Sequence, residues 1–307
     1  MKGEQGFALV ITLVVTALLV ALAVEFSDDV YVAAVSARTY VDAQQAGIMA
    51  ESGVDGALRL LQLSQVQGYT TLQDRWAQPL AIEDEKGSLT VTIEDETGKL
   101  NLNVVTLPNG TFNEVYQGMA ARLFKGQGLS PELCDSLADW IDDNDVPHPG
   151  GAENTYYGGL RPPYPAKNGR LETLEELRRV KGFDGPALER LRPLVTVYAE
   201  DPNAPAAPVN INTVPKELIV ALDDKMTNEL AERVIDYRKT TPFKSPADLA
   251  RVPGLETIAP GLQLRIQTKG TVFRVTSRAL VNETVRVVEA VVRATAFPPA
   301  VLYWREY

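Results

Sequence analysis

The residues best suited to chemistry lie in an acidic stretch near the middle of the chain. Between Asp135 and Thr155 there are six carboxylates and no lysine or arginine. Part of this stretch follows a predicted helix, whose C-terminal end already carries partial negative charge. Repulsion among so many anions is unfavourable, and a bound cation would relieve it. Ca²⁺ fits best, because it takes about six to eight oxygen ligands and tolerates the irregular geometry of a Gly/Pro-rich loop.

The acidic stretch allows other interpretations. Its spacing is not that of an EF-hand loop, because the sixth-position glycine and the terminal glutamate have no match. A solvated acidic loop without an ion stays open as the alternative. Paired carboxylates also serve general acid/base catalysis and glycoside hydrolysis. No aromatic substrate platform or second catalytic cluster accompanies them, so the sequence predicts a protein that is not an enzyme.

Composition narrows the class of protein. The chain has 307 residues, enough for two packed units, and a formal net charge of −10. That charge argues against nucleic acid and anionic lipid headgroups as main partners. Cys134 is the only cysteine and His148 the only histidine. A disulfide framework, a Cys/His zinc site and a Cys/His catalytic pair are therefore excluded within one chain.

The N-terminus predicts a membrane anchor that continues as a long helix. A short leader with Lys2, ending at Gly6, precedes 18 uncharged residues from Phe7 to Val24. Such a run can cross a bilayer core. Because Lys2 lies on one side of the run and acidic residues follow on the other, we expect one pass with the N-terminus in the cytoplasm. Apolar residues recur at a helical period beyond it, which predicts one continuous helix over 7–63.

Two predicted β-hairpins frame the rest of the chain. Residues 88–94 and 99–104 alternate apolar and polar side chains, and Glu96-Thr-Gly98 reads as the turn between them. Residues 271–281 and 284–294 form the second pair, which meets at Asn282-Glu283. Since a two-stranded ribbon is marginal by itself, we expect one antiparallel sheet that packs on the outer half of the long helix. The fold class is therefore α+β.

The region between the hairpins is predicted to be an all-α insertion of short helices. Several of these helices begin next to a proline, which suits the first helical turn. The predicted helices cover 114–125, 131–141, 171–180, 186–191, 215–222, 228–238 and 246–251. The predicted domains are a leader (1–6), the helix (7–66), an α/β domain (67–110 and 267–307) and the insertion (111–266), divided into modules 111–204 and 205–266.

A weak internal repeat lies within the insertion. Residues 176–183 parallel residues 248–255, and both resemble the turn of a helix-hairpin-helix or SAM-like module. The segments Asn101-Leu-Asn103 and Asn210-Ile-Asn212 are also alike, but they are 109 positions apart, whereas Gly182 and Gly254 are 72 apart. No single duplication explains both spacings. Residues 205–266 carry eight basic and eight acidic residues, so they offer no basic stripe for nucleic acid.

The N-terminal pattern resembles the class III signal of type IV pilins and type II secretion pseudopilins. The resemblance implies that a prepilin peptidase cuts between Gly6 and Phe7 and methylates the new N-terminus. The family's usual glutamate five residues into the mature chain is Ile11 here. A subunit without that carboxylate offers nothing to the terminal amine of a subunit stacked beyond it.

Lack of the glutamate, the helical insertion and the acidic stretch together resemble the K-type minor pseudopilins. The resemblance implies a subunit of the inner membrane, with its bulk in the periplasm, that starts or caps the pseudopilus tip with I-type and J-type minor pseudopilins and other pseudopilus subunits. It also implies a structural calcium site. We expect Asp142, Asp145, Glu153 and Asn154 as ligands, with Asp139 and Asp143 as further candidates. A membrane-anchored periplasmic binding protein with tandem helix-hairpin-helix modules is the alternative.

Overall fold

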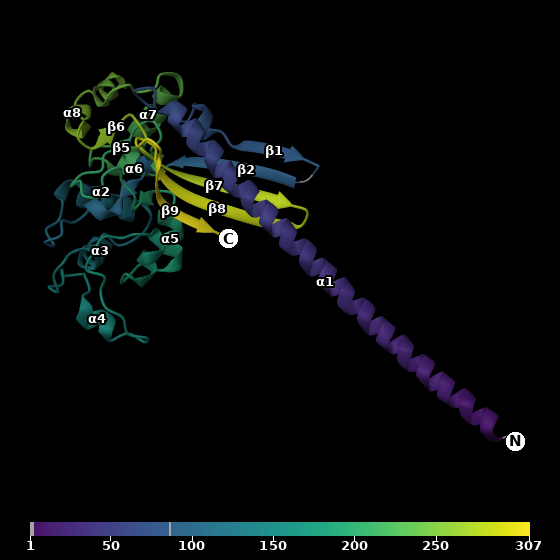
Figure 1. Ribbon diagram of the computed structural model, residues 1–307. Helices are drawn as coiled ribbons and strands as arrows, with labels where there is room; N and C mark the ends of the chain where they lie inside the picture. The colour runs from purple at the N-terminus through teal and green to yellow at the C-terminus, as the bar shows by residue number, and fades with distance from the viewer. Residues whose placement is uncertain (1–2, 86) are drawn as a thin grey trace.

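The computed structural model describes residues 3–85 and 87–307, and its organising element is one long helix. Helix α1 runs from Gly3 to Ser64, about 90 Å at the standard rise. Its first half stands free of the rest of the molecule, and its second half lies on the sheet (Figure 1). Ala46, Ala50 and Val54 are fully buried one helical turn apart, because this stripe faces the sheet. The predicted helix over 7–63 is confirmed.

Five antiparallel strands form the sheet, in the order β1-β2-β7-β8-β9. The predicted C-terminal hairpin is confirmed, with Asn282 at φ +51° in its turn. Strand β9 extends the sheet beyond this hairpin and was not predicted. The strand bounds are β1 Leu80–Asp84, β2 Gly87–Asp95, β7 Val272–Val281, β8 Thr284–Arg293 and β9 Ala300–Glu306.

The predicted first hairpin is wrong. Strand β2 pairs with β1 on one side and β7 on the other, so residues 99–104 do not return along it. Asp95 accepts a hydrogen bond from the Thr97 N–H and caps the 3₁₀ turn η2 (Glu96–Gly98), which leads the chain out of the sheet. The alternating residues beyond it are buried in the inserted region instead.

Helix α1 lies very close to the sheet at Gly53. An added Cβ there would overlap Ser277 Oγ and lie 2.9 Å from Val91 Cγ2. Only a residue without a side chain lets the helix backbone lie this near to β2 and β7. The core around this contact includes Trp76, whose ring meets Phe273 edge-on at 5.0 Å.

In the structure the insertion is the whole region between β2 and β7, which is longer than the predicted 111–266, and it contains short helices but is not all-α as predicted. Two minimal parallel strand pairs lie in it, β3 (Leu100–Asn101) with β4 (Val195–Thr196) and β5 (Val209–Asn210) with β6 (Ile266–Gln267). The α-helices are α2 Glu114–Gly126, α3 Leu133–Ile141, α4 Asn154–Gly158, α5 Gly185–Leu191, α6 Lys216–Ala221, α7 Asn228–Thr240 and α8 Ala259–Leu262. The 3₁₀ helices are η1 Arg75–Ala77, η2, η3 Leu102–Val104, η4 Leu174–Arg179 and η5 Pro246–Arg251.

Two buried asparagines make equivalent hydrogen bonds, one in each half of the insertion. Asn103 accepts from the Leu171 N–H and donates to the carbonyls of Leu171 and Val197. Asn212 accepts from the Phe243 N–H and donates to the carbonyls of Phe243 and Thr268. Each asparagine therefore ties the start of its module to the middle and the end of that module.

This equivalence explains why the two pairs of similar segments are 109 and 72 positions apart. Asn103 and Leu171 are 68 positions apart, whereas Asn212 and Phe243 are 31 apart, a difference of 37. The same 37 separates the spacings of 109 and 72. One repeat therefore accounts for both, provided that the first module carries 37 extra residues between Asn103 and Leu171. The acidic stretch falls inside that segment.

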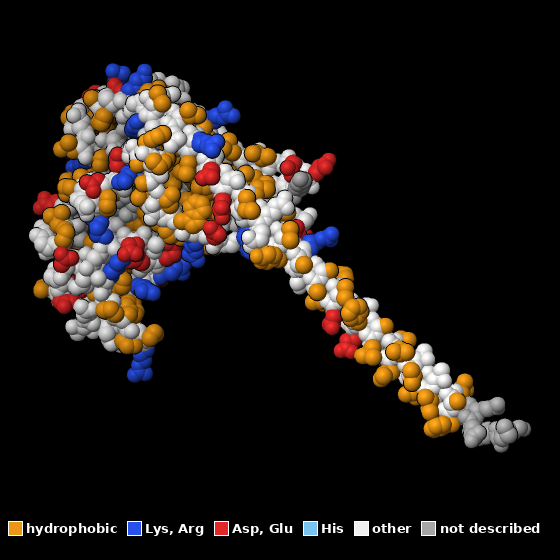
Figure 2. All heavy atoms as spheres, viewed as in Figure 1, with side chains coloured by type: hydrophobic (Ala, Val, Ile, Leu, Met, Phe, Trp, Pro, Cys, Tyr) orange, Lys and Arg blue, Asp and Glu red, His pale blue; other side chains and the backbone are white. Residues whose placement is uncertain are grey.

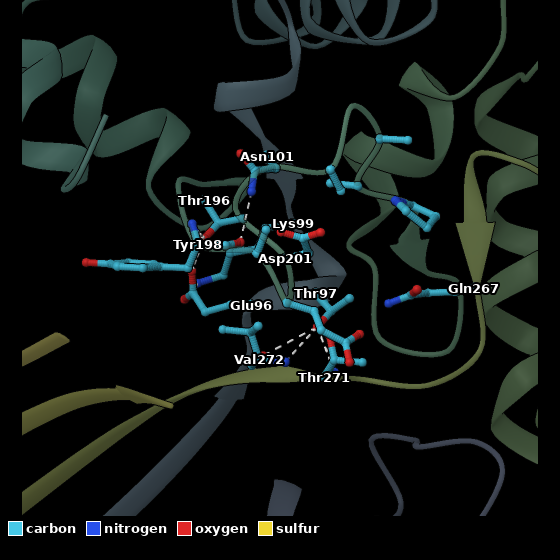
Figure 3. A pocket seen from close by; sticks show the side chains of 16 residues that line it. Glu96, Thr97, Lys99, Asn101, Thr196, Tyr198, Asp201, Gln267, Thr271 and Val272 are labelled. Carbon is cyan, nitrogen blue, oxygen red and sulfur yellow. Dashed lines mark hydrogen bonds and ion pairs between the residues drawn. The ribbon is translucent and has the colours of Figure 1, made fainter. Parts of the chain in front are cut away.

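The insertion joins the sheet at the end of β2, beside the C-terminal end of α1. Figure 3 shows this junction from close by, with Asn101 donating to the Tyr198 carbonyl and Thr97 held near Thr271 and Val272. A cavity of about 190 Å³ remains between these segments. In Figure 1 both modules therefore lie far from the free N-terminal part of α1.

Candidate metal centre

Helix α3 positions the first two acids of the site. Asp139 and Asp142 lie three residues apart, in the last turn and at the C-cap of α3, so they share one side of the helix end. Both side chains are completely buried. Gly151 allows the chain to pass directly over Asp139, since a Cβ there would overlap the Asp139 carboxylate.

Asp142 has one satisfied and one free oxygen. Its Oδ1 accepts from the backbone N–H of Asn144 at 3.0 Å and from Asn144 Nδ2 at 2.8 Å. Its Oδ2 is buried without a hydrogen-bond partner among the described residues. Burial raises the pKa of Asp142 above its usual value, and the charge of Asp139 adds to this. A buried carboxylate oxygen in this state is a ready ligand for a cation.

Glu153 is buried and lacks hydrogen-bond partners for its carboxylate among the described residues. Its side chain is almost fully buried, and neither carboxylate oxygen has a hydrogen-bond partner in the described part of the chain. Burial, together with the nearby charges of Asp139, Asp142 and Asp145, raises the pKa of Glu153 to about 7. The two ends of the loop thus bring their acids together, although 11 positions separate Asp142 from Glu153.

The remaining predicted ligands lie at the rim. Asp145 is exposed and accepts from Asn154 Nδ2 at 2.5 Å. Asn154 uses its Oδ1 to accept from the Ala166 N–H, so that oxygen has one lone pair left for an ion. Asp143 is exposed, and its backbone N–H donates to the Pro108 carbonyl at 2.8 Å. Asp143 therefore adds charge beside the site.

His148 belongs to the site and was not predicted there. Its Nδ1 lies 2.5 Å from Asp139 Oδ1, and its backbone N–H donates to the same carboxylate. Asp139, Asp142 and His148 can each place one donor atom within 4.8 Å of the others. The signal available in the sequence was the position of the only histidine, between two groups of acids.

An aromatic cluster supports the loop from inside. Trp140 packs edge-on against Tyr157 at 5.1 Å, and Tyr157 stacks on Tyr164 at 5.4 Å. The Tyr157 hydroxyl accepts from the Lys181 N–H, which ties the loop to the rest of the module. The acids are thus mounted on a packed scaffold, and within residues 3–85 and 87–307 no lysine or arginine forms an ion pair with Asp139, Asp142 or Glu153.

The second set of predicted functional residues lies at the free end of α1. An added Cβ at Gly6 would have no atom of the described residues within 4 Å, and Phe7 and Ile11 are exposed. An apolar window in this helix has a mean hydropathy of 3.0 and is not buried in the molecule, so the helix is long and apolar enough to cross a membrane. Figure 2 shows hydrophobic side chains along this free segment.

Comparison with known proteins identifies the family. Two models of type II secretion system protein K match the chain, one over residues 98–200 and one over residues 209–268. Together they cover more than half of it. The chain belongs to the type II secretion system protein K family. The first family model ends just before β5, where the second module begins.

Relatives and a solved structure agree with this family. The chain is 27% identical to protein K of Aeromonas hydrophila, over 84% of this chain and 85% of the relative. It is 28% identical to protein K of Klebsiella pneumoniae, over 82% and 81%. In the crystal structure of the GspK-GspI-GspJ complex from enterotoxigenic Escherichia coli, one chain matches with a TM-score of 0.75 and 21% identity, over 89% of this chain and 99% of that one.

The protein K family confirms the predicted function class, a minor pseudopilin of type II secretion. Its relatives are named as components of a secretion system. The match to the solved structure confirms the fold class, a long N-terminal helix on an antiparallel sheet in a mixed α/β chain.

Proposed function

We propose that this chain starts or caps the pseudopilus of a type II secretion system, at its tip. The observation that carries the proposal is the placement of the two inserted modules at the C-terminal end of α1, far from the free end of that helix (Figure 1). Subunits that align their helices with α1 can add from below. A subunit above would meet the modules, so the filament grows in one direction only.

The free half of α1 supplies the surface for these neighbours. Beyond the membrane segment, residues 25–41 are all exposed, and apolar side chains recur among them every three or four positions. They include Phe26, Val30 and Val41, with Ala34 and Ala37 between them. Small residues at this spacing let a second helix approach closely. The partners we infer are I-type and J-type minor pseudopilins, the companions of the similar chain in the solved complex.

The N-terminus supports processing and insertion in the inner membrane. We infer that a prepilin peptidase cuts between Gly6 and Phe7 and that Phe7 is then methylated. The charge distribution favours a cytoplasmic N-terminus and a periplasmic globular part. Ile11 leaves the mature helix without an acid at the position that would attract the terminal amine of a further subunit.

The acidic loop fits a structural Ca²⁺ ion. Asp142 Oδ2 and both oxygens of Glu153 are buried and have no hydrogen-bond partner in the part of the chain that the structure describes, which is the condition that a hard cation relieves. Asp145 and Asn154 could complete the ligand set from the rim, with Asp139 and Asp143 close by. The ion would supply positive charge that holds the two ends of the loop together. We assign no catalytic step to these residues.

The alternative function, capture of a ligand such as DNA by the hairpin modules, has an observation against it. In DNA-binding hairpins the backbone amides of the turn hold a phosphate. Here the Gly254 N–H already donates to the carboxylate of Glu256, at 3.1 and 3.0 Å from its two oxygens. In the second module the carboxylate of Glu256 thus occupies the position that a phosphate would take.

The proposal is tested by mass and by assembly. The full chain is expressed with and without a prepilin peptidase, and its intact mass is measured after membrane extraction. We expect a chain that begins at methylated Phe7 only with the peptidase, and we expect Gly6→Leu to stay uncut while Gly3→Leu is cut normally. Co-purification with I-type and J-type pseudopilins should then require the α1 surface. Cleavage elsewhere, or no association, would refute the model.

A further inference from the structure

His148 brings a nitrogen donor into a site that calcium would bind through oxygen alone. Its Nδ1 lies 2.5 Å from Asp139 Oδ1, so a hydrogen bond joins the two groups. Asp139, Asp142 and His148 can each place a donor atom within 4.8 Å of the other two. Zinc is held at about 2.0–2.2 Å by histidine and carboxylate. Tetrahedral ligands at this distance from one ion lie about 3.3 Å from each other. His148 Nδ1 and Asp139 Oδ1 must therefore move slightly apart for one ion to contact all three residues.

The surroundings hold these donors in place. Asp139 and Asp142 are completely buried at the end of α3. The backbone N–H of His148 donates to both oxygens of Asp139, at 3.1 and 3.2 Å. The centre of the Phe112 ring lies 4.6 Å from that of the imidazole. Asp142 Oδ2 is buried and has no partner among residues 3–85 and 87–307. This free buried oxygen is evidence for a ligand that is independent of the cluster itself.

The chemistry of the donors selects the ion class. Carboxylates and carbonyls suit Ca²⁺, whereas imidazole suits Zn²⁺ and its neighbours among the divalent transition metals. An open cavity of about 540 Å³, lined in part by Asn144, Val146 and His148, lies beside the site and gives an ion a path from solvent. On binding, the hydrogen between Nδ1 and Oδ1 would leave to water.

We propose that Asp139, Asp142 and His148 form a second binding mode of this site, which takes Zn²⁺ or a similar transition-metal ion. Asp142 is common to both ligand sets, so zinc and calcium compete. Glu153 serves the calcium mode only. The inference concerns the ion site described under the proposed function, but it does not require calcium to bind.

The test uses the full, untagged chain in lipid nanodiscs. Equilibrium dialysis against Zn²⁺ or Ca²⁺, followed by metal analysis, gives the affinity for each ion. We expect His148→Gln to weaken zinc binding at least about tenfold, since even loss of a supporting hydrogen bond weakens metal sites by that factor. Calcium binding should change far less, because the imidazole offers no oxygen ligand. Glu153→Gln should do the reverse. A loss of zinc binding in His148→Gln can be assigned to one imidazole, because His148 is the only histidine in the sequence.

Other zinc ligands are not expected to interfere. Cys134 is the only cysteine, and burial raises the pKa of its thiol to about 12, which disfavours the thiolate that zinc needs. A second readout needs no variant: titration with Zn²⁺ should shift the imidazole resonances of the single histidine, and Ca²⁺ should not shift them in the same way. This measurement keeps the test valid if His148→Gln fails to fold.

The possible results separate the two proposals. Zinc held equally well by wild type and His148→Gln, or no zinc at all, would refute the second mode and leave His148 as a support for the loop. Zinc that depends on His148 without any calcium binding would refute the calcium proposal alone. We expect zinc and calcium to compete for the wild-type chain. In His148→Gln, zinc should no longer displace calcium.

Discussion

Asn210 donates from Nδ2 to Asp95 Oδ2 at 2.8 Å, and this hydrogen bond fastens the second module to the end of strand β2. Thr213 donates to the same oxygen at 2.7 Å. The next residue, Glu96, is also fully buried and accepts from Thr196 of the first module. Two consecutive acids at the end of one strand therefore hold one module each.

Removal of the Asn210 amide should loosen the second module. Asn210→Ala leaves Asp95 buried with one partner fewer, which costs about 1–3 kcal/mol of unfolding free energy. Denaturant unfolding measures the loss, and hydrogen exchange should rise in β5 and β6. Asn203→Ala, at an exposed position in the linker between modules, is the control and should change neither. Equal effects of both substitutions would contradict this role.

Glu96 should make stability depend on pH. Burial raises its pKa, but the charges of Lys99 and Arg274, at 2.7 and 2.9 Å, outweigh burial and hold the pKa below the usual 4.5. The native state therefore releases this proton more readily than the unfolded state. The stabilisation is complete above pH 4.5 and is lost as pH falls towards the native pKa.

Comparison with Glu96→Gln isolates this contribution. Near neutral pH the variant leaves Arg274 and Lys99 short of a buried partner, and we expect a loss of about 3 kcal/mol. The difference in unfolding free energy should shrink below pH 4.5. Asp95 shifts the other way, because burial raises its pKa, so the wild-type pH profile alone does not report Glu96. A difference that stays constant with pH would contradict the assignment.

Two glycines of α1 should respond in opposite directions to the same change. Gly53→Ala forces a methyl group against Ser277 and Val91 and should cost about 1–3 kcal/mol. Gly56 has no atom within 4 Å of an added Cβ. Gly56→Ala should therefore stabilise the helix by roughly 0.5–1 kcal/mol. Thermal unfolding of both variants in the same detergent decides this, and a loss in both would show that the close approach does not matter.

The equivalence of the modules predicts matched losses. Asn103→Ala and Asn212→Ala each leave three buried backbone groups without their partner, which costs on the order of 3 kcal/mol. We expect hydrogen exchange to rise only within the module that carries the substitution. A large loss from one asparagine and none from the other would contradict the shared role.

Removal of calcium should release the acidic loop. With a chelator, repulsion among Asp139, Asp142 and Glu153 is no longer offset, so limited proteolysis should cut within 143–153. The fluorescence of Trp140, which packs on the loop through Tyr157, should change with it. Glu153→Gln should show a smaller response to the chelator, and an unchanged pattern in wild type would argue for a loop that needs no ion.

Local patterns in the sequence determined much of the fold. The helix over 7–63, the hairpin of β7 and β8 and several inserted helices follow from periodicity and from proline positions, which act over a few residues. The acids near 139–154 were visible for the same reason, since their charge and the absence of basic residues are features of one short stretch.

Tertiary structure decided what depends on distant partners. Alternation over residues 99–104 is equally compatible with a strand of the sheet and with burial in the inserted core, and Asp95 selects the second by capping the turn before it. The approach of Glu153 to the charge of Asp142 and the place of His148 beside Asp139 depend on how a long loop folds back. Side chains far apart in the chain meet only through packing of the whole module, so periodicity could not reveal which oxygens stay without a partner.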